Sequence, residues 1–371
     1  MKIVVAFDKF KGSLTAREAC RIACEALREV LPHAEIISQP LADGGEGTSE
    51  ILLDTLHGEW MPCEVTGPLM EERVMAGYTW LCEQDVSVVE MARASGLGLL
   101  RAGQRNPLHT TTFGTGELLH AAFSHKAPVW LTVGGSATVD GGVGAATALG
   151  WKFLKADGSP LAPGGGSLLN LHSIEPPHAQ RFPRIDVLCD VENPLCGDQG
   201  AARIFGPQKG ASPHEVEQLE AGLERLANVV HASLGIDISH LKGGGAAGGL
   251  AAGAVAFLGA HLVSGIDSIL EIVRFRESLA GADWVITGEG CFDEQSLYGK
   301  VVSGVVRAAG AAKVKVALIA GHIAVPEVIY RPRGISAARS LIQPGMTLDD
   351  SITRAPALLR QRAVDLASHM T

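Results

Sequence analysis

Short apolar runs that end in glycine-rich polar turns recur along the chain. Residues 3–6, 129–133 and 284–287 are rich in β-branched side chains, as is typical of strands buried on both faces of a sheet. After the first of these turns, apolar residues recur at helical spacing as far as Leu31, and Thr15 is placed to cap that helix. The alternation of strand-like apolar runs with apolar residues at helical spacing predicts strand–turn–helix units and therefore an α/β fold.

A different pattern begins near residue 60. Over residues 60–89, short and partly alternating runs are separated by glycine turns, which is typical of antiparallel hairpins. The chain, at 371 residues, also exceeds what one hydrophobic core usually holds. We therefore predict a discontinuous Rossmann-like domain, residues 1–60 plus 280–371, with a second α/β domain inserted at residues 61–279.

The charge balance and the cysteine pattern restrict the class of partner. A formal net charge of -9 argues against nucleic acid or an anionic membrane as the main partner. The seven cysteines are scattered without a CxxC pair, as expected of reduced thiols in the cytoplasm. The first apolar run meets Asp8 too soon for a signal peptide, and residues 246–262 contain the glycines of a packed core helix rather than a membrane span. We predict a cytoplasmic protein with a small-molecule substrate.

The turn after residues 129–133 carries a candidate ligand site. Gly134 and Gly135 lack Cβ atoms, so a bulky anion can approach the backbone N–H groups there closely. Ser136 and Thr138 add hydroxyl groups, and Asp140 adds a carboxylate. This pattern fits a cradle for a phosphate or a polyol, and it fits equally a structural turn in which Asp140 caps the next helix.

Acidic residues flank glycines in two further turns. Asp43 and Glu46 follow one inferred strand, and Glu289 and Asp293 follow another. Carboxylates at strand ends can hold a metal ion or substrate hydroxyl groups, and the alternative for the first pair is a capped helix start. Because both termini build one predicted domain, we expect all four acids to converge on one cleft, with at least one binding magnesium.

Three charged residues are candidates for the chemistry itself. Asp190 ends a buried run and has the character of a general base or a magnesium ligand, or else of a simple turn residue. Lys11 and Lys209 each lie in a turn beside a glycine, where they can meet phosphate or carboxylate oxygens unless they are ordinary surface lysines. Other candidate substrate-binding or nucleotide-binding residues in such turns are Ser13, Arg105, Thr115, Asn193, Gln208, Gly288 and Lys300.

Several motifs follow one another in a distinctive order. They are Phe10-Lys11-Gly12-Ser13-Leu14 and residues 42–48, 65–69, 90–92, 94–97, 104–108, 114–118, 134–142, 189–195, 205–211, 243–250 and 286–290, with Asp293. In this order and over nearly the whole length, the chain resembles the bacterial glycerate kinase family. The resemblance implies transfer of the γ-phosphoryl group of ATP to D-glycerate, with Mg²⁺ as cofactor and 2-phosphoglycerate as product. The oligomeric state stays open, a homo-oligomer included.

Two other functions remain alternatives at this point. A nicotinamide-dependent hydroxy-acid dehydrogenase would use the G-x-G-x-x-G match at residues 243–248, with Asp267 at the spacing of a ribose-binding acid. An inactive sugar-acid sensor on the kinase fold is permitted by two local departures from the family. The chain has Phe7-Asp8-Lys9-Phe10 where the family usually has Pro-Asp-Ser-Phe, and Cys291-Phe292-Asp293-Glu294-Gln295 where it usually has Arg-Ile-Asp-Ser-Gln. Both departures change the cations near a predicted anion site.

Overall fold

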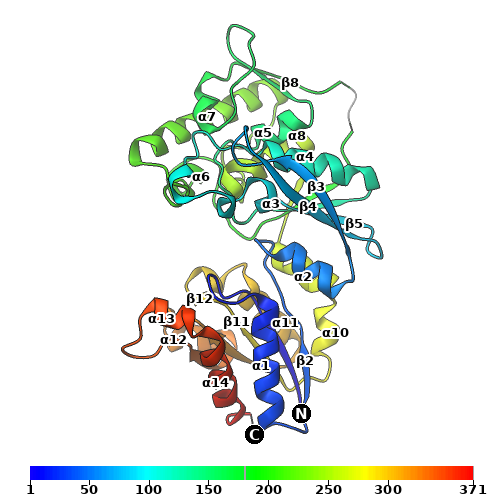
Figure 1. Cartoon of the computed structure of the whole chain (residues 1–371), viewed down its shortest axis with the longest axis vertical. Coiled ribbons are helices and arrows are strands. Elements are labelled where there is room, and N and C mark those ends of the chain that lie inside the picture. The colour runs from blue at the N-terminus through cyan, green and yellow to red at the C-terminus, as the bar shows by residue number, and fades with distance from the viewer. Residues whose placement is uncertain (179–180, 371) are drawn as a thin grey trace. The chain divides into compact units, whose positions relative to one another are not determined.

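The chain divides into two compact units in a computed structural model that describes residues 1–178 and 181–370. The first unit joins Met1–Asp43 to Ser264–Thr371, and the second is Gly44–Val263. Both chain ends therefore belong to the first unit (Figure 1). The limits predicted from the sequence differ, because residues 44–60 group with the second unit and residues 264–279 with the first.

A five-stranded parallel sheet forms the centre of the first unit. Its strands, in spatial order, are β15 (Ile335–Ser340), β13 (Lys315–Ala320), β11 (Trp284–Gly288), β1 (Lys2–Phe7) and β2 (Glu35–Ser38). Numbered along this unit alone, the order is 2-1-3-4-5, one of the common orders of doubly wound sheets. The order reverses between β1 and β11, and in such sheets ligands bind outside the carboxyl ends of the strands at that point.

The apolar alternation along β1 explains how this sheet is covered. Ile3, Val5 and Phe7 share one core cluster with the buried faces of α1 (Ala16–Val30) and α14 (Ala355–Ala367). Thr15 caps α1 through a reciprocal pair of hydrogen bonds with Glu18, so the predicted cap is confirmed. The remaining helices of this unit are α9 (Gly265–Ile272), α10 (Phe275–Leu279), α11 (Val301–Ala312), α12 (Glu327–Tyr330) and α13 (Leu348–Thr353), and a small parallel pair joins β12 (Cys291–Phe292) to β14 (His322–Ile323).

A six-stranded mixed sheet organises the second unit. Its spatial order is β10 (His261–Val263), β9 (Ile185–Leu188), β6 (Val129–Thr132), β5 (Val86–Glu90), β4 (Arg73–Leu81) and β3 (Glu59–Thr66). The β3, β4 and β5 strands pair antiparallel, which confirms the hairpins predicted from the alternating pattern. The β5, β6, β9 and β10 strands run parallel, so the turns after β5, β6 and β9 lie at one edge of the sheet.

The second unit also contains helices and a further pair of strands. They are α2 (Thr48–Thr55), α3 (Ala92–Ser95), α4 (Phe113–Ala122), α5 (Val143–Ala148), α6 (Ala201–Phe205), α7 (Pro213–Leu234) and α8 (Leu250–Leu258), with β7 (Lys152–Leu154) paired to β8 (Ser173–Glu175). The predicted core helix at residues 246–262 is shorter than expected, because α8 ends at Leu258 and β10 follows. Within the described residues, no helix has both the length and the apolar character that crossing a membrane requires.

Candidate functional site

A buried cluster around Asp140 lies at the carboxyl edge of the second unit's sheet. The side chain of Asp140 is 1% exposed, and its Oδ2 accepts hydrogen bonds from the backbone N–H and the hydroxyl of Thr112, at 2.8 and 2.9 Å. The backbone N–H groups of Gly142 and Gly144 donate to the same carboxylate at 3.1 and 3.2 Å. Burial raises the pKa of Asp140, and these hydrogen bonds oppose that rise. Asp140 thus joins the start of α4 to the start of α5.

Lys209 completes this cluster from inside the protein. Its side chain is buried, and its Nζ donates to the Oγ of Ser136 at 2.8 Å and to the carbonyl oxygen of Thr138 at 2.7 Å. Burial lowers the pKa of Lys209 to about 7, although the nearby Asp140 carboxylate acts in the opposite direction. The lysine therefore anchors the loop that follows β6, and its ammonium form carries one further proton beyond the two that it donates here.

Close packing explains why Gly134, in the loop after β6, is a glycine. A Cβ atom added at Gly134 would lie 2.6 Å from the Cα of Gly45, so the loop and the turn at residues 44–46 come too close for any side chain there. Thr115, another candidate ligand, donates its hydroxyl to Ser95 at 2.9 Å and is fully buried. Packing within the second unit thus accounts for Gly134 and for Thr115.

Asp190 lies at the same edge of the sheet as the Asp140 cluster. It lies two residues after the end of β9 and is half-buried. Thr132 at the end of β6 pairs with Leu188 at the end of β9. Because both strands run in parallel, Asp190 and the loop after β6 leave the sheet on one side. Of the other candidates in this unit, Asn193 donates to the carbonyl oxygen of Gln199 at 2.8 Å, and Gln208 and Arg105 are exposed.

A separate charged cluster, that of the first unit, lies at the switch point of the first unit's sheet. Asp8 follows β1 and Glu289 follows β11, and the backbone N–H of Asp8 donates to the carbonyl oxygen of Gly288 at 2.9 Å. Each of the two acidic side chains is 7% exposed. Gly288 itself has no room for a side chain, since a Cβ atom there would lie 1.6 Å from the carbonyl oxygen of Ile319. Adjacent parallel strands thus bring the two acids to one place.

The acids of the first unit repel one another. Burial raises the pKa of Glu289 to about 7, and Asp43 and Asp293 raise it further while Lys300 lowers it. Burial is also the main cause of the raised pKa of Asp8, with added repulsion from Asp43 and Glu289. The Oε1 atom of Glu289 is buried and has no hydrogen-bond partner among the described residues. An unpartnered buried carboxylate oxygen is costly unless a ligand completes it.

Three of the four acids predicted to converge are neighbours of one another, and Asp8 is a further acid beside them. Asp43, Glu289 and Asp293 belong to the first unit, whereas Glu46 belongs to the second. Asp8 was not among the predicted site residues. Its position directly after an apolar run could have identified it. Within residues 1–178 and 181–370, no group of three or more His, Cys, Asp or Glu side chains is arranged to hold a metal ion unaided.

The other predicted site residues of the first unit differ in their burial and in their contacts. Lys300 is half-buried, with its Nζ 3.9 Å from the Oδ1 of Asp293. Ser13 donates its hydroxyl to the carbonyl oxygen of Phe10 at 3.0 Å, within the turn after β1. Lys11 is exposed in the same turn. Lys300 is therefore a predicted cation that lies beside these acids.

The fold and the clusters define an α/β protein with buried charges at the carboxyl ends of its parallel strands. The model of the glycerate kinase family matches residues 3–371, and the chain belongs to that family. A glycerate kinase from Halalkalibacterium halodurans is 42% identical, with 98% of this chain and 97% of that protein covered. A glycerate 2-kinase from Escherichia coli is also 42% identical, with 96% and 94% covered.

A solved structure agrees with the family assignment. The crystal structure of a protein provisionally named glycerate kinase 2, from Salmonella typhimurium LT2, superimposes with a TM-score of 0.83 at 40% identity. The match covers 100% of this chain and 98% of the other. The dehydrogenase alternative finds no such support: residues 243–248 do not follow a strand directly, and Asp267 lies in the other unit, paired with Arg307.

Proposed function

We propose that this chain transfers the γ-phosphoryl group of ATP to D-glycerate and releases 2-phosphoglycerate. The observation that carries the proposal is the similarity, over nearly full length, to proteins named glycerate kinase and glycerate 2-kinase. Phosphoryl transfer needs positioned N–H groups, cations and carboxylates rather than covalent catalysis by the protein. The buried acids and lysine at the strand ends supply groups of these kinds.

We infer that the first unit is a Rossmann-like domain into which the second α/β unit is inserted. Its 2-1-3-4-5 strand order and its two discontinuous segments support this description. Asp8 and Glu289 lie at the switch point, where open sheets of this kind bind their ligands. The phosphates of the nucleotide and the magnesium ion bind here in our proposal.

The residues at the switch point fit magnesium by their chemistry. Mg²⁺ usually binds through one or two carboxylates, keeps several waters and takes further oxygens from substrate phosphates. Asp8 and Glu289 would hold it, and Glu289 has a buried oxygen without a partner among the described residues. When bound, the ion neutralises charge on the phosphoryl group during transfer. Asp43 and Asp293 would bind the outer waters, and Glu46, which belongs to the second unit, stays a predicted magnesium ligand.

In the second unit, Asp190 is the proposed general base. It orients the attacking hydroxyl of glycerate and accepts its proton late, because the transition state is loose and needs little early deprotonation. Lys209 and Ser136 hold the glycine loop in shape, and the remaining ammonium proton of Lys209 is available to an anionic group of the substrate. Lys11 and Lys300 are the proposed phosphate-binding cations of the first unit.

A coupled assay of ADP release with D-glycerate tests the activity, with ³¹P NMR of the product to distinguish 2- from 3-phosphoglycerate. An NADH absorbance assay with the same acid runs beside it. We expect glycerate-dependent ADP release and no nicotinamide turnover. ADP release that does not depend on glycerate, or hydride transfer in the second assay, would contradict the proposal.

A further inference from the structure

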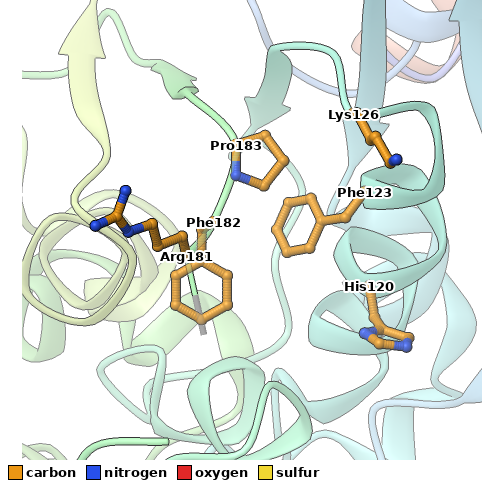
Figure 2. Close-up of a pocket in the computed structure, with 6 residues that line it drawn as sticks. All are labelled: His120, Phe123, Lys126, Arg181, Phe182 and Pro183. Carbon is orange, nitrogen blue, oxygen red and sulfur yellow. The ribbon is translucent and has the colours of Figure 1, made fainter. Parts of the chain in front are cut away.

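A pocket opens at the opposite edge of the second unit's sheet from the candidate active site (Figure 2). Its volume is about 360 Å³. Two segments line it: the last turn of α4 with the residues leading into β6, and residues 181–183 leading into β9. The lining residues are His120, Phe123, Lys126, Arg181, Phe182 and Pro183. We call it the amino-edge pocket, because Val129 and Ile185, the first residues of β6 and β9, pair beside it.

The middle of the amino-edge pocket is apolar and aromatic. The rings of Phe123 and Phe182 have centroids 5.7 Å apart and are tilted by 47°. Figure 2 shows these rings and Pro183 at the centre, with Arg181 on one side and Lys126 and His120 on the other. Half-buried phenyl rings stack on flat ligands at little cost in ordering. The volume lies within the range of about 300–1,000 Å³ that is usual for small-molecule sites.

The rim of the pocket carries positive charge from Lys126 and Arg181. Within residues 1–178 and 181–370, no ion pair involves His120, Lys126 or Arg181, and no acid lines the pocket. The whole chain has a formal net charge of -9, so this local excess of cations is unusual for the molecule. Arginine and lysine at a pocket rim bind carboxylate or phosphate groups through charge-assisted hydrogen bonds.

One helix joins the amino-edge pocket to the candidate active site. The residues that start α4 bond to Asp140, through the Thr112 backbone and hydroxyl groups, and the last turn of the same helix contains His120. A ligand that moves the end of α4 therefore acts on the element that holds the Asp140 cluster. We propose that the amino-edge pocket is an effector site for a planar ring that bears a phosphate or carboxylate group.

Binding is tested by calorimetry on the full chain with a non-hydrolysable ATP analogue and D-glycerate both saturating, so that the active site is filled. AMP and benzoate are the probes with a ring and an anion. Adenosine lacks the anion, and ribose 5-phosphate lacks the planar ring. We expect AMP, benzoate or both to bind, and each of the incomplete probes to bind at least tenfold more weakly. If only AMP binds, the site prefers a phosphate, and if only benzoate binds, it prefers a carboxylate.

Variants assign the binding to this pocket. Phe182→Ala is expected to weaken it about tenfold, the scale of one lost stacking contact, and the exposed Arg181→Ala about two- to fivefold. Arg276→Ala, which removes an exposed arginine of the other unit, is the matched control and leaves binding unchanged. If Phe182→Ala impairs folding, Arg181→Ala together with Lys126→Ala still decides the assignment.

The effector role has its own measurement, which rests on the proposed kinase activity, whereas the binding measurement does not. The bound probe is expected to change kcat/KM for glycerate at least twofold in the unmodified protein and not in Arg181→Ala. The inference is overturned if neither AMP nor benzoate binds with the active site filled. It is also overturned if the pocket variants bind the probe as tightly as the unmodified protein, or if the bound probe leaves kcat/KM unchanged.

Discussion

The two units bury charge in opposite ways. In the first, Asp8 and Glu289 lie among further acids, and one Glu289 oxygen has no hydrogen-bond partner in the described part of the chain. In the second, hydrogen bonds from Thr112, Gly142 and Gly144 satisfy Asp140, and Lys209 donates two hydrogen bonds to the loop beside it. The first cluster needs a ligand to balance it, whereas the second is balanced internally and holds a loop in shape. Buried charge alone thus does not identify a binding site.

The largest expected effect concerns the base at the edge of the second unit. Asp190→Asn keeps the size and much of the orienting ability of the side chain but removes the proton acceptor. We expect kcat to fall by about 10²–10⁴-fold, the usual range for a general base, with ATP affinity almost unchanged. Steady-state kinetics beside a calorimetric ATP titration measures both quantities.

Asp198→Asn provides the matched control for this variant. Asp198 is an exposed acid of the same unit, and its substitution is expected to leave kcat within a factor of two. A near-normal kcat in Asp190→Asn would remove Asp190 from the chemistry. Lost ATP binding in that variant would instead make it a ligand of the magnesium–nucleotide complex.

Glu289→Gln tests whether the first cluster is built for a ligand. Removing one charge-assisted contact to Mg²⁺–ATP is expected to raise KM for ATP at least tenfold. The Tm is expected to stay the same or to rise, because a neutral amide is less costly to bury among acids than a carboxylate. Kinetics over a range of Mg²⁺ concentrations and a thermal melt measure the two effects.

The exposed Glu294→Gln in the same segment is the control, with KM expected to be unchanged. A clear fall in Tm with normal KM would show that Glu289 is structural. The acidic cluster of the first unit would then be structural, like the Asp140 cluster of the second.

Asp140→Asn is expected to act on stability first. The amide can accept at only one of its two terminal atoms, so at least one of the donors from Thr112, Gly142 and Gly144 is left unpaired in a buried place. The free energy of unfolding should fall by about 1–3 kcal/mol. Urea denaturation measures this loss, with the exposed Asp157→Asn as a control that changes it by less than about 0.5 kcal/mol. An unchanged stability would mean that Asp140 is not the anchor of this loop.

The sequence predicted the elements better than it predicted their grouping. The apolar runs identified β1, β6 and β11, and the alternating pattern identified the β3–β4–β5 hairpins, because both signals are local. The limits of the two units depend on long-range contacts, and the contact pattern groups residues 44–60 and 264–279 differently from the predicted limits.

The same distinction holds for the candidate site. The grouping of Asp43 with Glu289 and Asp293 followed from the idea that both termini share one sheet. Asp8 joins them only because β1 and β11 are parallel neighbours, a pairing that spacing along the chain does not reveal. The burial of Lys209 was likewise hidden, because its partner Ser136 lies 73 positions away in the chain.

A final expected effect is a pH dependence of stability that comes from Lys209. Burial lowers its pKa to about 7, well below the unfolded value of about 10.4. Between these two values the unfolded chain binds more protons than the folded one, so Lys209 makes stability rise with pH over that window. Below about pH 7 both states carry the charge, and the cost of burying it is then present in full.

Lys209→Met should remove this rise. The Tm of the unmodified protein minus that of Lys209→Met is expected to increase from pH 7 to pH 9.5, by about 2–4 °C for each kcal/mol involved. Lys313→Met, at an exposed lysine of the other unit, serves as the control and should give a constant difference. A constant difference for Lys209→Met as well would mean that Lys209 keeps its ordinary pKa. Its hydrogen bonds to Ser136 and Thr138 and the nearby Asp140 carboxylate would then offset the cost of burying the ammonium group in full.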